Sequence, residues 1–182
     1  MPLQHRHFSV HSMVLLLRRL LFGPLALVFS LWALNLSSAD AANGFIPKPA
    51  KVTDNVYAII GPLSQRSESN AGLNANYGFV ITAAGVILID SGASFYGATM
   101  LEKAVKEVTP KLIRWVLNTG SQDHRWLGNS YFAKQGAEVH AMAGTVKTQQ
   151  VYALQQLDNL KRFVAGQLDG TSPFYATKTH KC

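Results

Sequence analysis

The sequence contains one cysteine among its 182 residues, and that cysteine is the last residue, Cys182. A single cysteine excludes a disulfide framework, even for a protein that reaches an oxidising compartment. The chain also lacks a strongly basic segment, because no run of Lys and Arg is longer than two residues. Scattered basic residues are typical of a solvated surface, so we expect no nucleic-acid partner.

Charged residues make up only 15% of the chain and hydrophobic residues 48%, as in globular rather than disordered proteins. The length is enough for one domain. Part of the hydrophobic excess lies at the N-terminus, where residues 1–41 have the pattern of a signal peptide. Arg18 and Arg19 precede an apolar run at residues 20–36, and Ala39-Asp40-Ala41 is a cleavage site of small residues.

We therefore predict a signal peptide at residues 1–41, cleaved after Ala41. The protein would then be periplasmic or secreted, without stable membrane association. The alternative is an uncleaved membrane anchor, because the apolar run at residues 20–36 is at the short end of a membrane span. The domain to be explained is residues 42–182.

Within that domain, short apolar runs alternate with helical patterns. The order indicates a layered α/β (α+β) fold. The solid apolar run at residues 86–89 predicts a strand covered on both faces. Residues 44–53 predict an extended lead-in, residues 61–75 a long polar loop, and residues 177–182 neither strand nor helix. Strands are predicted at residues 55–60, 76–82, 86–90, 113–117 and 138–141, and helices at residues 96–108, 127–135 and 145–165.

The most informative stretch begins where the strand at residues 113–117 ends in Asn118-Thr119-Gly120. Polar residues follow, and a helical pattern starts after Gly128. Ligands of α/β sheets bind at the carboxyl ends of strands. Asp123 and His124, two candidate metal ligands, fall in this loop. The simpler alternative is a structural brace, in which Asp123 accepts backbone hydrogen bonds and His124 donates one to a carbonyl group.

Together, Asp90-Ser91-Gly92 at the end of one strand and Asn118-Thr119, Asp123-His124 and Gly128-Asn129 after the next resemble the metallo-β-lactamase-fold hydrolases. The resemblance covers about residues 52–167. It matches the N-terminal half of that family's αβ/βα sandwich and implies a partial domain at residues 42–182. We therefore expect a truncated chain, or dimerisation that completes the fold.

The motif of this family is His-x-His-x-Asp-His. Asp123 and His124 match its last two positions, whereas Thr119 and Ser121 stand at the positions of the first two histidines. The resemblance thus implies part of the second zinc site, with Asp123 and His124 as metal ligands and Asp123 as the catalytic group that orients water. It implies no first zinc site, because a neutral hydroxyl group is a poor zinc ligand. Catalytic zinc needs three protein ligands, so the zinc site is altered and incomplete.

The resemblance also implies residues that support the site. Asp90 matches an aspartate that braces the ligand loop by hydrogen bonds, and Asn118 makes turn bonds beside it. The long polar loop matches the segment that flanks the active site of the family. His140, on a predicted strand, is expected to be a hydrogen-bonded core or edge histidine. The loop residues expected to contact a ligand are Gln65, Arg66 and Asn70.

Two functions follow from these residues. The first is an exported zinc-dependent hydrolase with an altered site, acting on a small-molecule substrate. The alternative is a non-catalytic periplasmic binding or accessory protein of the same fold, which the missing histidines favour. A third interpretation is a truncated chain without function. The substrate does not follow from the sequence, because one fold hosts many activities.

Overall fold

The computed structural model describes residues 44–181. The predicted signal peptide and Cys182 lie outside the described residues. Among residues 44–181, no helix combines the length and the hydropathy that a membrane crossing requires.

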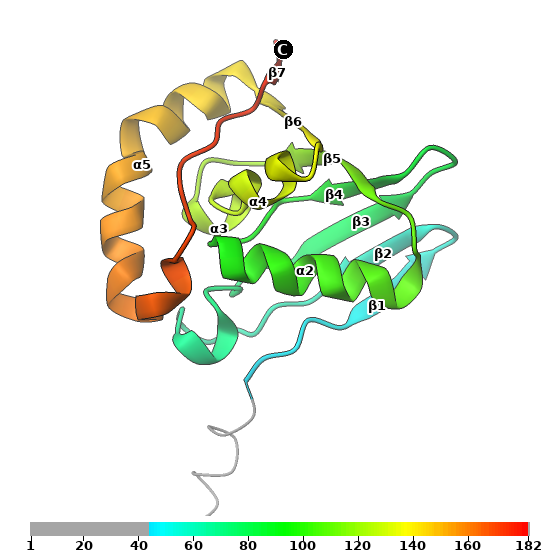
Figure 1. The fold of residues 1–182 in the computed structure, drawn as a ribbon, viewed down its shortest axis with the longest axis horizontal. Coiled ribbons are helices and arrows are strands. Elements are labelled where there is room, and N and C mark those ends of the chain that lie inside the picture. Colours follow the sequence, from blue (N-terminus) through cyan, green and yellow to red (C-terminus); the bar gives the residue numbers. More distant parts are fainter. Residues whose placement is uncertain (1–43, 182) are drawn as a thin grey trace, which may run out of the picture. The chain divides into compact units, whose positions relative to one another are not determined.

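A seven-stranded mixed sheet runs through this part of the chain, with its strands in sequential order (Figure 1). The first four strands are antiparallel neighbours, and the last three join the sheet in parallel. Parallel neighbours need crossover connections, and helices supply them here. The strands are β1 (Pro49–Thr53), β2 (Val56–Ile59), β3 (Tyr77–Ile81), β4 (Val86–Ile89), β5 (Ile113–Asn118), β6 (Glu138–Met142) and β7 (Lys178–His180).

The helices divide among the three crossovers. The long α2 (Phe95–Val108) joins β4 to β5, and Ser94 caps it by accepting a hydrogen bond from the N–H of Gly97 at 3.0 Å. The short α3 (Asp123–Trp126) and α4 (Asn129–Lys134) join β5 to β6. The longest helix, α5 (Ala143–Val164), continues into a 3₁₀ turn, η2 (Ala165–Leu168), before β7. Another 3₁₀ turn, η1 (Glu68–Asn70), lies in the polar loop.

The hydrophobic core lies between the sheet and the helices that cover one of its faces (Figure 1). Along β4, Val86 and Leu88 are buried, whereas Ile87 and Ile89 are only half-buried. The prediction that this strand is covered on both faces is therefore wrong for the described chain. An uninterrupted apolar run shows that both faces of the strand carry apolar side chains. It does not show whether a helix covers one of these faces or both. The core side chains that meet the sheet include Leu101, Ala104, Val105 and Phe132.

The predicted strands and helices form at the expected places, and the α/β class is confirmed. Three elements differ from the prediction. Residues 49–53 pair as β1, residues 178–180 pair as β7, and residues 123–126 form a helix within the predicted loop. β7 is exposed at every residue, so it carries no apolar alternation and owes its strand form to pairing with β6.

A second, smaller core lies under the loop that follows β5. Trp126 and Leu127 pack there against Ala153, Leu160 and Val164 of α5. Trp126 is completely buried, and its ring stacks on Tyr175 with centroids 5.4 Å apart. The packing of Trp126 and Leu127 against α5 holds α3, and with it the two candidate ligands, against the long helix.

Candidate functional site

The loop after β5 is tied to the end of β4 by Asp90. The Asp90 carboxylate accepts hydrogen bonds from the backbone N–H of Thr119 at 2.7 Å and from the Thr119 hydroxyl at 2.7 Å. The Arg125 guanidinium donates to the same carboxylate at 2.9 Å. Asp90 is buried and has a left-handed φ of 62°, a conformation that is uncommon for residues other than glycine. The strained strand end thus serves to hold the loop.

Beneath the loop lies a group of three buried polar side chains, Ser91, Asn118 and Asn129, which we call the amide brace. Asn118 and Asn129 exchange hydrogen bonds of 3.0 and 2.8 Å between their side-chain amides. The Ser91 hydroxyl donates to Asn129 at 2.8 Å, and Asn129 donates to the Phe174 carbonyl at 2.9 Å. The brace joins the ends of β4 and β5 to the start of α4, so it fixes the loop at both ends.

The glycine beside the brace is required by close packing of the backbone. The Gly128 N–H donates to the carbonyl of Gly92 at 3.0 Å. A Cβ atom on Gly128 would lie 2.0 Å from the Ser91 carbonyl oxygen, far inside van der Waals contact. The Gly-Asn pair in the sequence therefore reflects the docking of α4 on the end of β4.

Two glutamines of α5 hold the middle of the loop. Gln149 donates to the Gly120 carbonyl at 3.2 Å, and Gln156 donates to the Ser121 carbonyl at 2.8 Å. Gln156 also accepts a hydrogen bond from the Trp126 indole at 2.9 Å. These two roles were not predicted from the sequence. The available signal was the presence of polar residues on the inner face of a long amphipathic helix, where apolar residues are expected.

The candidate ligands meet a third side chain, Arg66, and we call Arg66, Asp123 and His124 the Arg66 cluster. One terminal nitrogen of Arg66 donates a hydrogen bond to Asp123 Oδ1 and lies 2.9 Å from His124 Nδ1. Asp123 Oδ1 and His124 Nδ1 are 3.2 Å apart. The backbone N–H of His124 donates to the same carboxylate oxygen at 2.8 Å. The side chains are 11–22% exposed. A guanidinium cation from a distant loop therefore contacts both predicted metal ligands.

The charges in this cluster shift the pKa of Asp123. Burial by itself would raise the pKa of this carboxyl group, because it disfavours the charged form. Hydrogen bonding from His124 and the positive charge of Arg66 outweigh burial, so the pKa lies below its ordinary value. Asp123 is therefore ionised at neutral pH and paired with Arg66.

The remaining predicted loop residues shape the segment that carries Arg66. Asn70 is buried, and its side-chain oxygen Oδ1 accepts hydrogen bonds from the backbone N–H groups of Ser67 and Gly72, both at 3.0 Å. The side-chain nitrogen Nδ2 of Asn70 donates to the backbone carbonyl of Gln65 at 2.9 Å. The exposed Gln65 side chain accepts a hydrogen bond from the Arg66 N–H at 3.2 Å. Arg66 is thus the loop residue that reaches the predicted ligands.

Tyr77, on β3, is a neighbour of the site that the sequence analysis missed. Its hydroxyl group is buried and has no hydrogen-bond partner among the described residues. Burial raises the pKa of this phenol far above its ordinary value, and the negative charges of Asp90 and Asp123 raise it further. Tyr77 therefore stays protonated. No pattern in the sequence marks it, because a tyrosine on a half-buried strand is expected in a core.

The side chains at the Arg66 cluster do not fit a zinc ion. Catalytic zinc needs three protein ligands, and among residues 44–181 no three His, Cys, Asp or Glu side chains are arranged to hold a metal. The two candidate ligands already contact a cation, the Arg66 guanidinium. Thr119, at a position where the motif has histidine, instead donates its hydroxyl hydrogen to Asp90.

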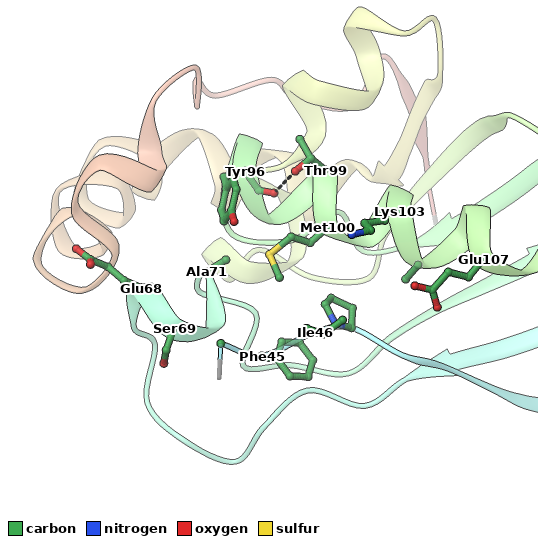
Figure 2. Close-up of a pocket in the computed structure, with 13 residues that line it drawn as sticks. Phe45, Ile46, Glu68, Ser69, Ala71, Tyr96, Thr99, Met100, Lys103 and Glu107 are labelled. Carbon is green, nitrogen blue, oxygen red and sulfur yellow. Dashed lines mark hydrogen bonds between the residues drawn. The ribbon is translucent and has the colours of Figure 1, made fainter. Parts of the chain in front are cut away.

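Two cavities lie near the polar loop. One, of about 270 Å³, is lined by Arg66 and Asp123 together with α5. A larger one, of about 480 Å³, lies between the start of the described chain, the polar loop and α2, with Phe45, Met100 and Lys103 among its lining (Figure 2). The larger cavity shares no lining residue with the Arg66 cluster, so we assign the candidate site to the smaller one. Its other lining residues are Gln156, Asn159, Leu160, Arg162 and Phe163.

Comparison with known proteins identifies the fold. No family model and no curated protein matches the sequence. Among solved structures, the metallo-β-lactamase FIM-1 from Pseudomonas aeruginosa in its mono-zinc form matches with 17% identity and a TM-score of 0.54, over 76% of this chain and 52% of that one. The metallo-β-lactamase from Hirschia baltica matches with 13% identity and a TM-score of 0.50, over 75% and 52%. The chain therefore has the metallo-β-lactamase fold, as predicted, and spans about half the length of these neighbours.

Proposed function

We propose that this chain is a metal-free binding protein with the metallo-β-lactamase fold, in which the Arg66 guanidinium replaces the metal ion. The observation that supports the proposal is the contact of one guanidinium nitrogen with both Asp123 Oδ1 and His124 Nδ1. A fixed cation neutralises the carboxylate, as a metal would, but offers no open coordination position to activate water. Exported by the predicted signal peptide, the protein would act in the periplasm or outside the cell.

The ligand we propose is a small organic anion held in the cavity beside the Arg66 cluster. Arg162 lines this cavity and forms no ion pair within residues 44–181, so its charge is available to an anionic group. Leu160 and Phe163 add an apolar wall. An arginine next to an apolar wall suits a carboxylate on a hydrophobic body.

Titration calorimetry with sodium benzoate tests this ligand class. We expect saturable binding that weakens at least about 10-fold in Arg162→Gln, since a hydrogen bond to a charged group contributes roughly 1.5–3 kcal/mol. Arg114→Gln is the matched control, because it removes the same charge from an exposed position on β5. Equal weakening in both variants, or no binding by the unaltered protein, would contradict the proposed ligand.

The exported hydrolase remains the second candidate function. Asp123 Oδ1 and His124 Nδ1 favour it, because they lie 3.2 Å apart and face a common cation, as two ligands of one metal do. Zinc would have to displace Arg66 and recruit further ligands. The two candidates therefore predict opposite results for zinc binding that depends on Asp123.

Zinc content after dialysis against zinc chloride separates the two candidates. For the metal-free protein we expect Asp123→Ala to change the zinc content by less than about a tenth of an equivalent. Loss of a full equivalent in Asp123→Ala, together with ester or lactam hydrolysis that disappears in His124→Ala, would establish the hydrolase instead. The comparison of variants matters, because zinc bound elsewhere on the chain is common to all of them.

A further inference from the structure

The face of the sheet that the helices leave open is apolar across four neighbouring strands, and we call it the open face. Residues directly opposite one another on paired strands point to the same side of a sheet. Ile87 of β4 lies opposite Val80 of β3 and Trp115 of β5. Continued to β2, this register gives the larger apolar side chains of the open face as Val56, Val80, Ile87, Ile89, Trp115 and Leu117.

The fold of residues 44–181 leaves these side chains in contact with solvent. Their helices cover the opposite face of the sheet (Figure 1). On the open face, Ile87, Ile89 and Trp115 are half-buried, and Leu117 is 36% exposed. A depression of about 310 Å³ lies there, lined by Thr82, Ile87, Trp115, Leu117 and His140. Monomeric proteins rarely expose an apolar patch larger than about a few hundred Å², so a patch of this kind marks an interface.

The sequence of β4 is that of a strand with cover on both sides. Val86-Ile87-Leu88-Ile89 is apolar throughout, which is typical of strands that are buried on both faces. The helices of residues 44–181 bury Val86 and Leu88 only. The cover for Ile87 and Ile89 therefore comes from outside residues 44–181.

A second copy of the chain fits the open face by symmetry. A two-fold axis parallel to the strands, between β3 and β4, places β2–β5 of one copy on β5–β2 of the other, with the sheets about 10 Å apart. The apolar strands then meet in the centre. The strands β6 and β7, with Glu138, His140 and His180, fall toward the rim of the contact, where polar groups are usual.

The polar groups of β6 and β7 already have partners within one copy. His140 Nδ1 lies 3.1 Å from His180 Nε2 and forms a hydrogen bond with it, as predicted from the sequence for a core or edge histidine. His140 Nε2 lies 3.4 Å from Glu138 Oε2. A contact between two copies therefore leaves this pair of histidines intact.

The size of the open face also suits a dimer. Its first six strands span about 30 Å across the sheet, and a strand of five residues is about 17 Å long. The face therefore projects about 500 Å², and its accessible surface is larger because side chains roughen it. Each partner in a standard interface buries roughly 800 Å² of accessible surface. One open face thus provides about the area that one partner of a stable dimer needs.

We propose that the open face binds the open face of a second copy, so that the protein is a symmetric homodimer with β2–β5 at the centre of the contact. The proposal gives a definite form to the dimerisation expected from the sequence. It uses no residue of the Arg66 cluster and does not rest on the proposed binding function.

Size-exclusion chromatography of the full chain with light scattering tests the dimer. We expect the mass of two copies, and dissociation at least about 30-fold easier in Trp115→Glu, since a truncated or charged aromatic anchor at an interface costs that much. Leu154→Glu is the matched control, because it places the same charge on an apolar side chain of α5 that is 79% exposed. This control should remain a dimer.

Three results would overturn the proposal. The first is a monomer of the unaltered chain, and the second is a complex of one copy with a different protein. The third is an assembly that Trp115→Glu leaves unchanged, because the copies would then meet through another surface.

Thermal unfolding at several protein concentrations separates loss of the dimer from loss of folding. The unfolding midpoint of a dimer rises with protein concentration. We expect this rise in the unaltered chain and in Leu154→Glu, and none in Trp115→Glu or Leu117→Lys, with circular dichroism showing that each variant is folded below its midpoint. A midpoint independent of concentration in the unaltered chain, or an equal rise in the two open-face variants, would contradict the dimer.

Discussion

The amide brace and the Arg66 cluster lie at the same strand ends, yet they satisfy their polar groups in different ways. Ser91, Asn118 and Asn129 are 0–5% exposed, and they bond to one another and to nearby backbone. The Arg66 cluster is more exposed, and its cation comes from a loop 57 residues earlier in the chain than Asp123. The brace also joins residues that are distant in the sequence, such as Ser91 and Asn129, but it does so through several buried hydrogen bonds, whereas the cluster depends on one guanidinium group.

The residues that position the loop are therefore different from the residues that could bind a ligand or a metal. The brace positions the loop without using Asp123 or His124. The cluster uses the same two side chains that the family motif assigns to zinc, but pairs them with Arg66. If Arg66 takes the place of a metal ion, as proposed, the supporting framework of the loop does not depend on that metal. We expect the stability of the protein to depend on the brace more than on the cluster.

The largest effect is expected from Asn129→Ala. This change leaves the Asn118 amide, the Ser91 hydroxyl and the Phe174 carbonyl without their buried partner. We expect the free energy of unfolding to fall by about 3 kcal/mol, since unsatisfied buried groups cost roughly 1–3 kcal/mol each and relaxation recovers a part. Urea denaturation followed by circular dichroism measures it.

Gln155→Ala, at an exposed position of α5, is the control for that measurement. Surface substitutions of this kind change stability by no more than about 0.5 kcal/mol. If Asn129→Ala costs no more than this control, the brace does not support the loop, and the contrast between the two regions fails.

Much of this fold could be predicted because its central strands are apolar. The runs at residues 86–90 and 113–117 carry the buried Val86, Leu88 and Val116, and burial leaves a pattern in the sequence. β1 and β7 could not be predicted in this way, since almost all of their residues are exposed. Their form depends on pairing with neighbours that lie elsewhere in the chain.

The residues of the candidate site also differ in how far they could be predicted from the sequence. Asp123-His124 were singled out by their place after a strand, and Gly128-Asn129 by the resemblance to the family motif. Arg66 was expected to contact a ligand, and its contact with Asp123 was not foreseen. That contact depends on how the polar loop folds back over 57 residues, which no local pattern encodes. The roles of metal ligand and catalytic group stay predictions for Asp123 and His124.

An intermediate effect is expected from Arg66→Ala. The change leaves the Asp123 carboxylate partly buried without its cation, and we expect a loss of about 1–2 kcal/mol in urea denaturation. Arg66→Lys should restore less than half of this, because the lysine ammonium is a compact and strongly hydrated charge, which is harder to desolvate in a partly buried pair than a guanidinium. Full recovery with lysine would mean that charge alone matters and that the guanidinium geometry does not.

Zinc sharpens the same experiment. If the guanidinium takes the place of a metal, excess Zn²⁺ should restore part of the stability that Arg66→Ala loses. Zn²⁺ should not raise the stability of the unaltered protein. No recovery by zinc would indicate that Asp123 and His124 cannot bind a metal together, even without Arg66.

The smallest effect concerns pH and Asp123. The folded pKa of this carboxyl group lies below its ordinary value of 3.8, so near that pH the unfolded chain binds more protons than the folded one. The stabilisation by Arg66 and His124 is thus complete well above pH 3.8 and is lost as the pH falls through the folded pKa. Asp123→Asn removes this dependence, so the stability difference between variant and parent should shrink below about pH 4. Urea denaturation at a series of pH values measures that difference. Parallel curves would show that the ion pair adds nothing, so that the brace alone would hold the loop.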